Sequence, residues 1–456
     1  MQTPSTVNVS EIIDSSKIGA FQIGIFILCG LCLIMDGFDV QAIGYVAPYL
    51  SREWKISAPV LGSVLSAALV GVLFGSILLS MLADKIGRRP VLISAAFCFA
   101  VLTLLTPLAT SVGPLLLVRF LAGIPLGSIM PNALALVGEY SPRRARVPAM
   151  VVVGTGFTAG AAIGGLIAFW LIPHFGWRSI FYLGGAIPLV IGIFMLFVLP
   201  ESLQFLALHE KNPRALRQWL ARVDSNAPLD ANVKYIVPER KQKGVPLVKL
   251  FEQGRAARTL LLWVIYFMNL LNLYFLSSWL PTVATPMVKA AGAPASYALL
   301  VGSTLQVAGV LGAVFLGWCV QRFGFTVVLT TCFLLACGNI AAIGRPGLSL
   351  SLLFLVVFFA GLGVVGGQSV INALAATLYP TDLRSTSIGS GLGVGRIGSI
   401  VGPQVAGILI GLHWQAQQLF LTAAVPALIA ACMVLALHFV VKPHATAGAE
   451  SHAMVH

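Results

Sequence analysis

Charged side chains are scarce in this sequence. They make up 9% of its 456 residues, whereas 58% of the residues are hydrophobic, and the mean hydropathy is +0.94. A soluble globular domain normally has about a quarter of its residues charged, so this composition excludes a soluble globule. The chain is expected to fold with lipid as its main solvent.

Several kinds of chemical site are also missing from the pattern. All seven cysteines fall in apolar stretches, where they act as small packing residues rather than as a disulfide framework. The seven histidines lie in loops, tails or near helix ends and form no metal-type pair at bilayer depth. No metal, no cofactor and no enzymatic activity are therefore predicted. Nor is a cleavable signal peptide, because the polar segment up to Lys17 precedes an apolar stretch too long for a signal core.

What the sequence does contain is long apolar runs. Runs near or above the ~20 residues that cross a bilayer predict an all-α membrane protein with twelve transmembrane helices in two pseudo-repeats of six. These runs lie at about residues 20–48, 58–80, 90–110, 114–138, 147–172, 178–199, 259–288, 294–320, 325–344, 348–378, 385–411 and 416–441.

The spans divide the chain into five parts. We expect an N-terminal tail at 1–19, a six-helix bundle at 20–199, a central loop at 200–258, a second bundle at 259–441 and a C-terminal tail at 442–456. The central loop shows little apolar periodicity and is too small for a convincing soluble sensor domain. This argues against a sensor that does not transport.

Basic residues predict the orientation. Cytoplasmic loops carry the excess of Lys and Arg, and the central loop and the short loops on its side are much richer in them than the loops on the other side. The tails and the central loop are therefore predicted to be cytoplasmic, and the net charge of +13 reflects membrane topology rather than nucleic-acid binding. The short inner loops hold Lys85, Arg88, Arg89, Arg143, Arg144, Arg146, Arg322 and Arg384, and the outer loops hold Arg52, Lys55, Arg178, Lys289 and Arg345.

The two halves resemble each other. SMLADKIGR at 80–88 reappears as GWCVQRFGF at 317–325, and GSIMPNALALVGEY at 127–140 aligns with GQSVINALAATLYP at 367–380. Corresponding segments keep the same orientation, so the repeat is parallel. Such a repeat implies a two-fold axis along the membrane normal with a binding site between the halves, as in a rocking transporter.

Only four of the Asp, Glu, Lys and Arg residues lie well inside the predicted spans: Asp36, Asp39, Arg119 and Arg396. Charges at bilayer depth are costly, so they are functional candidates that usually have a partner. With a rise of ~1.5 Å per residue, Asp36 and Arg119 lie at similar depth in a ~30 Å hydrocarbon core, and Arg396 lies near the middle of its span in the other half. The alternative is a buried ion pair that only fixes helix packing.

These charges suggest a coupling hypothesis. With Asp36 and Asp39 ionised, an incoming carboxylate adds an uncompensated charge in a poorly solvated place. A proton on either aspartate would release an arginine for a bidentate contact with the substrate carboxylate. Proton and anion would then help each other bind, and linkage makes that help reciprocal.

Several motifs carry a resemblance to a known family. DKIGRR at 84–89, RFLAG at 119–123, PESLQFL at 200–206 and the weaker QRFG resemble the major facilitator superfamily over nearly the whole chain. DGFD at 36–39, FMNLLNLYFLSSWLPT at 267–282 and GVGRIGSIVGP at 393–403 are similar to the aromatic acid:proton symporter family. The resemblance implies proton-coupled uptake of a benzoate or hydroxybenzoate, a proton-coupling role for Asp36 and Asp39, and a monomer in a bacterial inner membrane.

An aromatic ligand needs flat apolar walls and a few polar groups. The span at 259–288 is rich in aromatic residues and carries Asn272 and Tyr274, and the next span carries Gln306. We predict that these three contact the substrate, together with Arg119 and Arg396. Trp279 is equally compatible with an interfacial aromatic belt, and Asn132 and Asn372 with hydrogen bonding between helices.

A second group of charges lies at the predicted inner mouth. In the superfamily such residues form charge networks that close the cytoplasmic side, and ion pairs suit that use because modest energies open them. The alternative is that the arginines only determine topology. The predicted gating residues are Asp84, Arg88, Arg89, Glu139, Arg143 and Arg322.

Small residues at helical spacing predict close helix crossings. Gly156, Gly160, Gly164 and Gly165 form one such set, and a second one runs from Gly389 to Gly398. The first set resembles the signature of drug:proton antiporters, but Ala161 stands where that signature has proline. Two rival functions stay open: a proton-coupled exporter, and a symporter of a non-aromatic organic anion.

Overall fold

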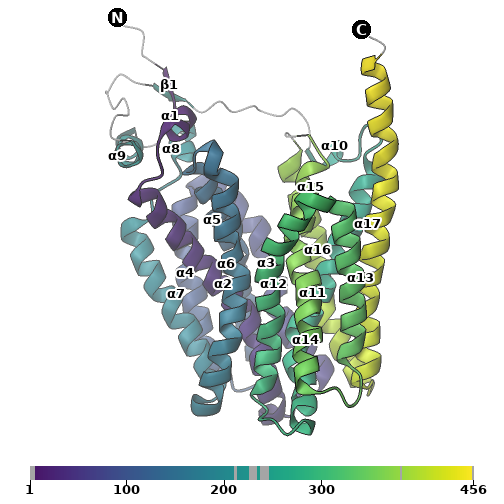
Figure 1. The fold of residues 1–456 in the computed structure, drawn as a ribbon. Coiled ribbons are helices and arrows are strands. Elements are labelled where there is room, and N and C mark those ends of the chain that lie inside the picture. The colour runs from purple at the N-terminus through teal and green to yellow at the C-terminus, as the bar shows by residue number, and fades with distance from the viewer. Residues whose placement is uncertain (1–5, 210–212, 225–233, 237–245, 381–382, 454–456) are drawn as a thin grey trace, which may run out of the picture. The chain divides into compact units, whose positions relative to one another are not determined.

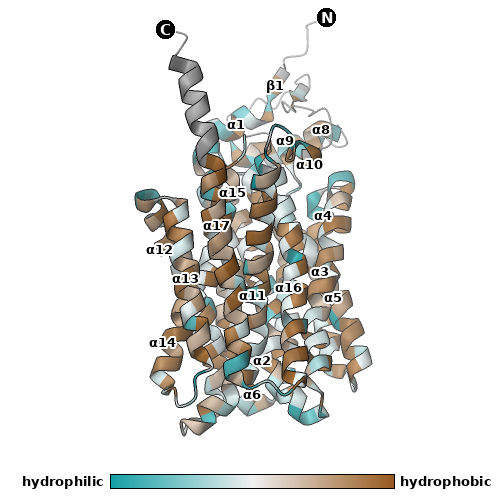
Figure 2. Cartoon of the chain, turned by 90° about the vertical axis from the view of Figure 1, so that its right-hand side faces the viewer, coloured by the Kyte–Doolittle hydropathy of each residue, from teal (hydrophilic) through white to brown (hydrophobic). Residues whose placement is uncertain are grey.

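The computed structural model is built almost entirely of helices (Figure 1). It describes residues 6–209, 213–224, 234–236, 246–380 and 383–453. Within these ranges, twelve helical stretches are long and apolar enough to cross a membrane, which confirms the predicted number of spans. Hydrophobic residues run along them, while hydrophilic residues gather toward helix ends such as the start of α4 and the end of α12 (Figure 2).

The spans of the N-terminal half begin and end close to the predicted positions. They are α2 (Ala20–Trp54), α3 (Ala58–Ile86), α4 (Arg88–Leu105) with the 3-10 turn η1 (Thr106–Leu108), α5 (Val112–Glu139), α6 (Arg143–Phe175) and α7 (Arg178–Val198). Proline inside α2, α5 and α7 is tolerated in membrane helices because neighbouring groups satisfy the freed carbonyls.

The spans of the C-terminal half follow the same plan. They are α11 (Ala256–Ala290), α12 (Tyr297–Phe323), α13 (Phe325–Ile343), α14 (Leu350–Gly361) continued by η2 (Leu362–Gly366) and α15 (Gly367–Thr377), α16 (Arg384–Gly411) and α17 (Ala416–Ala453), of which Ala416–Val441 is the apolar part. The segment η2 is a π-helical turn. Such turns interrupt the regular hydrogen-bond ladder and often lie at functional sites.

The helices form two compact units. Unit 1 comprises Met1–Val40, Val70–Gly160 and Arg178–Lys241, and unit 2 comprises Gln41–Leu69, Ala161–Trp177 and Gln242–His456. Parts of α2, α3 and α6 therefore belong to the same unit as the C-terminal helices. The sequence division into bundles at 20–199 and 259–441 stays a prediction about which parts move together.

Glycines let helix backbones touch inside each unit. In unit 1, a Cβ on Gly160 of α6 would lie 1.8 Å from the carbonyl oxygen of Ile34 in α2. In unit 2, a Cβ on Gly398 of α16 would lie 2.4 Å from the carbonyl oxygen of Phe267 in α11. The predicted second set splits, because the positions of Gly389 and Gly393 face open space. Only one side of that helix is a close-packed face.

The region at 200–258 is more structured than the sequence analysis expects. It contains α8 (Leu203–His209), α9 (Pro213–Val223), the strand β2 (Lys234–Ile236) and α10 (Pro246–Lys249). β2 pairs in parallel with β1 (Thr6–Asn8), which precedes α1 (Val9–Ser15). In α9, Leu216, Leu220 and Val223 are buried. The expectation of little apolar periodicity was wrong for this helix, because three turns are too short to stand out in a window of transmembrane length.

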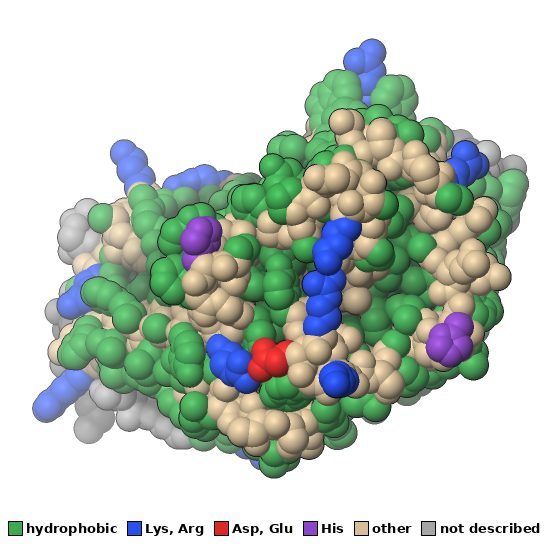
Figure 3. Space-filling view, turned by 90° about the horizontal axis from the view of Figure 1, so that it is seen from below, with side chains coloured by type: hydrophobic (Ala, Val, Ile, Leu, Met, Phe, Trp, Pro, Cys, Tyr) green, Lys and Arg blue, Asp and Glu red, His purple; other side chains and the backbone are tan. Residues whose placement is uncertain are grey.

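The face seen from below is largely hydrophobic and uncharged, with scattered Lys and Arg side chains and little acidic surface (Figure 3). The cytoplasmic placement of both termini stays a prediction.

Candidate functional site: an intramembrane ion pair and a polar network

An ion pair lies inside the helices of unit 1. The Arg119 guanidinium on α5 donates from Nη1 to Oδ1 of Asp39 on α2 at 3.0 Å and from Nη2 to Oδ2 at 2.8 Å. It also donates to the Asp39 carbonyl oxygen at 3.3 Å. This is the bidentate geometry that a guanidinium allows and an ammonium does not.

The pair is sealed from solvent. Both side chains have a relative exposure of 0%. Thr103 donates a hydrogen bond to Oδ1 of Asp39 at 3.3 Å, and the Arg119 guanidinium lies 5.6 Å from the centre of the Phe181 ring. Removing either partner would leave an uncompensated buried charge, which costs about 3–5 kcal/mol. Arg119 can reach a substrate only after this pair opens.

Asp36 and Asp39 have different surroundings although they share a helix face. Asp36 is 5% exposed, whereas Asp39 is fully buried and makes the bidentate contact with Arg119. Between the two aspartates, Gly37 packs against α6, where its Cβ would lie 1.8 Å from the carbonyl oxygen of Phe157. The middle of the DGFD motif therefore sets a helix crossing, while its last residue carries the ion pair.

Arg396 lies near the middle of α16, in unit 2. Its side chain is half-buried. Within the described residues its guanidinium makes no hydrogen bond and no ion pair. A cation at this depth without a partner is costly, so a carboxylate ligand would be stabilised beside it.

The three predicted polar contacts of the substrate lie in different environments within unit 2. Asn272 on α11 is 1% exposed, and neither its Oδ1 nor its Nδ2 has a hydrogen-bond partner among the described residues. Tyr274 is also buried, at 7% exposure. An amide with both polar atoms unsatisfied is expensive to bury, so Asn272 has unused capacity for a ligand or a water molecule.

Gln306 on α12 is already engaged. Its Nε2 donates to Oγ of Ser277 on α11 at 2.9 Å and lies 3.5 Å from Oε1 of Gln41 on α2. Gln41 in turn donates to the Ser277 carbonyl oxygen at 2.5 Å. We call Gln41, Ser277 and Gln306 the amide cluster. It joins three helices of unit 2, and sequence reasoning missed Gln41 and Ser277 because both are uncharged, although Ser277 lies within the motif at 267–282.

A second neutral network connects α11 with α15. Asn269 Nδ2 donates to Gln368 Oε1 at 2.8 Å and to the Val364 carbonyl oxygen at 3.2 Å. Gln368 Nε2 lies 3.3 Å from Asn372 Oδ1, which also accepts from the Tyr266 hydroxyl at 2.8 Å. Val364 belongs to the π-helical turn η2, so Asn269 satisfies a carbonyl where the helical ladder is irregular.

The predicted gating residues meet in part. Arg88 at the start of α4 forms an ion pair with Glu139 at the end of α5, and Glu139 also accepts a hydrogen bond from Ser202. Glu201 caps α4 by accepting from the backbone amides of Arg88 at 2.9 Å and Arg89 at 3.1 Å. The motif at 200–206 signalled this residue, but sequence reasoning gave Glu201 no role.

The remaining gating candidates are more dispersed. The Arg89 side chain donates to the Leu196 carbonyl oxygen at 2.6 Å. Arg143 pairs with Asp14 at 3.0 Å, but its side chain is 78% exposed, so this pair contributes little. Asp84 and Arg322 are exposed and form no ion pair within the described residues. All the bonds described for Arg88, Arg89, Glu139 and Arg143 lie inside unit 1.

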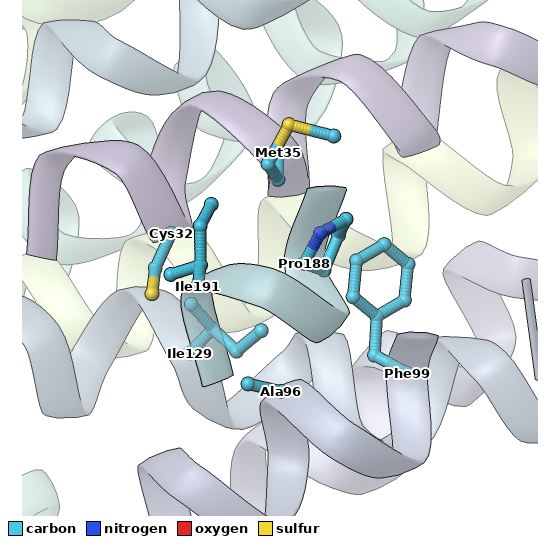
Figure 4. A pocket seen from close by; sticks show the side chains of 7 residues that line it. All are labelled: Cys32, Met35, Ala96, Phe99, Ile129, Pro188 and Ile191. Carbon is cyan, nitrogen blue, oxygen red and sulfur yellow. The ribbon is translucent and has the colours of Figure 1, made fainter. Parts of the chain in front are cut away.

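A small apolar cavity lies near the Asp36 helix turn. Its lining includes Cys32 and Met35 of α2, Phe99 of α4 and Pro188 of α7 (Figure 4). Its volume of about 10 Å³ admits no more than about one water molecule. An aromatic acid cannot be accommodated there.

Comparison with known proteins identifies the family. A family model described as the Major Facilitator Superfamily matches residues 29–389 and again residues 262–454. This chain belongs to the major facilitator superfamily. Overlapping matches that begin in each half agree with the internal repeat. Together with twelve spans and bacterial relatives, membership makes the chain a multi-pass protein of the bacterial inner membrane and not an enzyme.

Individual relatives in the superfamily cover almost the whole chain. The "4-hydroxybenzoate transporter PcaK" of Pseudomonas aeruginosa is 38% identical, over 97% of this chain and 98% of the relative. The "Gallate transporter" of Pseudomonas putida is 35% identical, over 94% and 95%. A solved bacterial homologue of the human lysosomal transporter Spinster, in an inward-facing and unoccupied conformation, has a TM-score of 0.71 at 18% identity, over 93% of this chain and 98% of that one. This last likeness concerns the fold alone.

Proposed function

We propose that this chain is a proton-coupled symporter that takes up a small aromatic carboxylate, such as a benzoate or hydroxybenzoate, by alternating access. The observation that carries the coupling part is the fully buried Asp39–Arg119 pair. The aromatic acid is proposed from the names of the relatives, which transport 4-hydroxybenzoate and gallate. We further propose that it acts as a monomer, with both termini in the cytoplasm.

The coupling step begins at Asp39. While its carboxylate is ionised, both of its oxygens are bonded to Arg119. A proton on Asp39 removes the negative charge and weakens those bonds, because a neutral acid is a poorer acceptor than a carboxylate. Arg119 would then carry an uncompensated positive charge, and an incoming anion would restore neutrality. Asp36 would tune this step from one turn away on the same helix face.

The substrate carboxylate is proposed to bind Arg396. Arg396 has no protein partner within the described residues and Arg119 has one, so Arg396 is the arginine that is available before protonation. A bidentate contact would fix the plane of the carboxylate and hence of the ring attached to it. Arg119 would contribute favourable charge once Asp39 is neutral.

We propose that neutral polar groups of α11 bind the ring substituents of the substrate. Asn272 can donate and accept, and both atoms of its amide are unsatisfied within the described residues. A ring hydroxyl could satisfy both at once, because a hydroxyl is itself donor and acceptor. Tyr274 supplies apolar ring surface on the same helix.

Alternating access needs contacts that close one side of the transporter and can separate without leaving a buried charge unpaired. The amide cluster joins α2 to α11 and α12 through neutral bonds, and we propose that it is part of the outer seal. Gln306 then acts mainly as a sealing residue and contacts the substrate only when the cluster separates. The Arg88–Glu139 pair is proposed to belong to the inner gate.

The test is uptake by the purified protein in liposomes. A panel of benzoate, 4-hydroxybenzoate, gallate and a non-aromatic carboxylate is offered with and without an inward proton gradient. We expect saturable accumulation of at least one aromatic acid that rises with the gradient. Accumulation of the non-aromatic acid alone would reject the aromatic part, and accumulation driven only by an outward gradient would replace symport by antiport.

A further inference from the structure

We propose that unit 1 carries a binding site for one anionic phospholipid at the start of α4. A pocket of about 620 Å³ lies there, enclosed by α4, α7, α8 and α9. It is lined by Arg89, Ser94 and Phe97 of α4, Leu196 of α7, Phe205 of α8 and Trp219 of α9, among others. The proposal does not depend on which acid is transported.

The position of the pocket suits a lipid. Arg89 is the second residue of α4 and Phe97 lies eight residues further along, so the pocket extends about 12 Å from the helix start into the apolar part of the span. Beside it on α7, Phe194 and Phe197 are exposed hydrophobic residues. An acyl chain could therefore leave the bilayer and enter the pocket without crossing water.

The polar end of the pocket holds one basic and one acidic residue, Arg89 and Glu201. Arg89 uses one guanidinium nitrogen for the Leu196 carbonyl oxygen, and its buried Nε has no hydrogen-bond partner within the described residues. Glu201 also lines the pocket, but Oε1 of its carboxylate already accepts from the amides of Arg88, Arg89 and Ser202. The unused donor capacity at this end therefore belongs to Arg89, and it matches a phosphate oxygen.

Helix α9, which lines the pocket with Trp219, adds basic charge and is held in place by aromatic contacts. Trp219 stacks on Phe21 at the start of α2 with 5.8 Å between ring centres, and the Arg222 guanidinium lies 5.1 Å from the Trp219 ring. Arg214 and Arg222 of α9 are exposed, whereas its leucines face inward. A basic amphipathic helix at this level attracts anionic headgroups.

The occupant follows from these three features. An apolar channel open to the bilayer requires an acyl chain, and the unsatisfied arginine with basic residues above it requires a negative headgroup. Free inorganic phosphate would leave the apolar part empty, and a zwitterionic lipid would bring a second positive charge to a basic site. Phosphatidylglycerol fits both requirements.

The experiment is native mass spectrometry of the purified full-length protein in detergent, titrated with phosphatidylglycerol or with phosphatidylethanolamine of the same acyl chains. We expect one retained phosphatidylglycerol, bound about tenfold more tightly than phosphatidylethanolamine, because the two lipids share the phosphate and only the second brings an ammonium group toward the basic residues. Soluble glycerol phosphate should not displace it. Equal retention of the two lipids, or displacement by glycerol phosphate, would overturn the proposal.

Two variants and a matched control locate the site. Ser94→Trp places an indole in the pocket and should abolish retention, whereas Val101→Trp, on an exposed position of the same helix that does not line the pocket, should not. Arg89→Gln keeps the apolar channel and should weaken the binding of phosphatidylglycerol about tenfold, because the charge-assisted hydrogen bond to the phosphate is lost. Retention of the lipid by Ser94→Trp at the wild-type level, or an unchanged affinity for phosphatidylglycerol in Arg89→Gln, would refute the proposed site.

Discussion

The two units treat their intramembrane arginines in opposite ways. In unit 1, Arg119 is fully buried and bonded to both carboxylate oxygens of Asp39. In unit 2, Arg396 is half-buried and has no partner within the described residues, and the polar groups in the middle of the neighbouring helix α11, such as Asn269 and Asn272, are neutral. A paired charge can be switched by one proton, whereas an unpaired charge attracts an anion directly. The difference suggests that unit 1 senses the proton and unit 2 holds the substrate.

The largest effect on this difference between the units is expected when the Asp39 carboxylate of unit 1 is neutralised. Asp39→Asn should abolish accumulation driven by a proton gradient while substrate exchange at equal pH continues, because the site would be fixed in its protonated form. Liposome uptake and counterflow measure the two activities. Glu252→Gln, at an exposed carboxylate, is the control.

Asp39→Asn also leaves Arg119 uncompensated, with a cost of about 3–5 kcal/mol in stability. The double variant Asp39→Asn with Arg119→Gln should recover thermal stability without recovering coupled accumulation. Normal gradient-driven uptake by either variant would remove Asp39 from the coupling mechanism.

The next largest effect is expected at the arginine of unit 2. Arg396→Gln should weaken substrate binding about 100-fold, because a bidentate charged contact is lost, and Arg396→Lys should recover little of it. Binding of the acid to purified protein, measured by calorimetry, checks this. Arg345→Gln, an exposed arginine on a loop, should bind as the wild type does. If Arg396→Gln retains full affinity, the carboxylate binds elsewhere.

Substitutions at the helix crossings test whether the stability of the two units depends equally on close packing. Gly398→Ala in unit 2 and Gly160→Ala in unit 1 place a methyl group 2.4 Å and 1.8 Å from a backbone oxygen, and each should cost about 1–3 kcal/mol. Gly393→Ala and Gly30→Ala, where the space is open, are the matched controls. Thermal unfolding in detergent should show a lower stability for Gly398→Ala and Gly160→Ala than for the two controls. Equal stability of all four variants would contradict the described crossings.

A smaller and more selective effect is expected at Asn272. Asn272→Leu should reduce the affinity for hydroxylated benzoates about tenfold, since a buried hydroxyl would lose its partners. Benzoate itself should bind as well as before or better. Competition of each acid against a labelled substrate gives the ratio. An equal loss of affinity for all acids would mean that Asn272 shapes the site without bonding to the ring hydroxyl.

The smallest effect is expected at the inner gate. Arg88→Ala removes a partly exposed ion pair worth about 1 kcal/mol and should slow transport several-fold without preventing insertion. Initial uptake rates, divided by the amount of protein in the membrane, measure this. Lys85→Ala, at an exposed basic residue nearby, is the control. Loss of Arg88→Ala from the membrane would instead support a topological role.

Prediction from the sequence succeeded where one physical rule dominates. Lipid excludes polar backbone, so the lengths of the apolar runs led directly to twelve spans. The scarcity of charge likewise selected Asp36, Asp39, Arg119 and Arg396 as candidates, although the depth estimate matched Arg119 with Asp36, whereas the bidentate contact is made to Asp39. The amide cluster escaped prediction because Gln41, Ser277 and Gln306 are neutral residues on three separate spans. The amphipathic helix α9 was not predicted because it is too short to stand out by its apolar periodicity.

The sequence by itself determined the solvent of this protein, its spans and its small set of intramembrane charges, because hydropathy and the cost of buried charge act residue by residue. Only the tertiary structure decided that Asp39 holds Arg119 in a bidentate contact, that Gln306 is bonded to Ser277, and that Arg89 faces a pocket. These choices depend on how helices rotate and cross, and the crossings are set by backbone contacts at glycines such as Gly37 and Gly160. Such contacts join positions more than a hundred residues apart, so the local spacing of glycines can mark a close crossing but does not identify its partner.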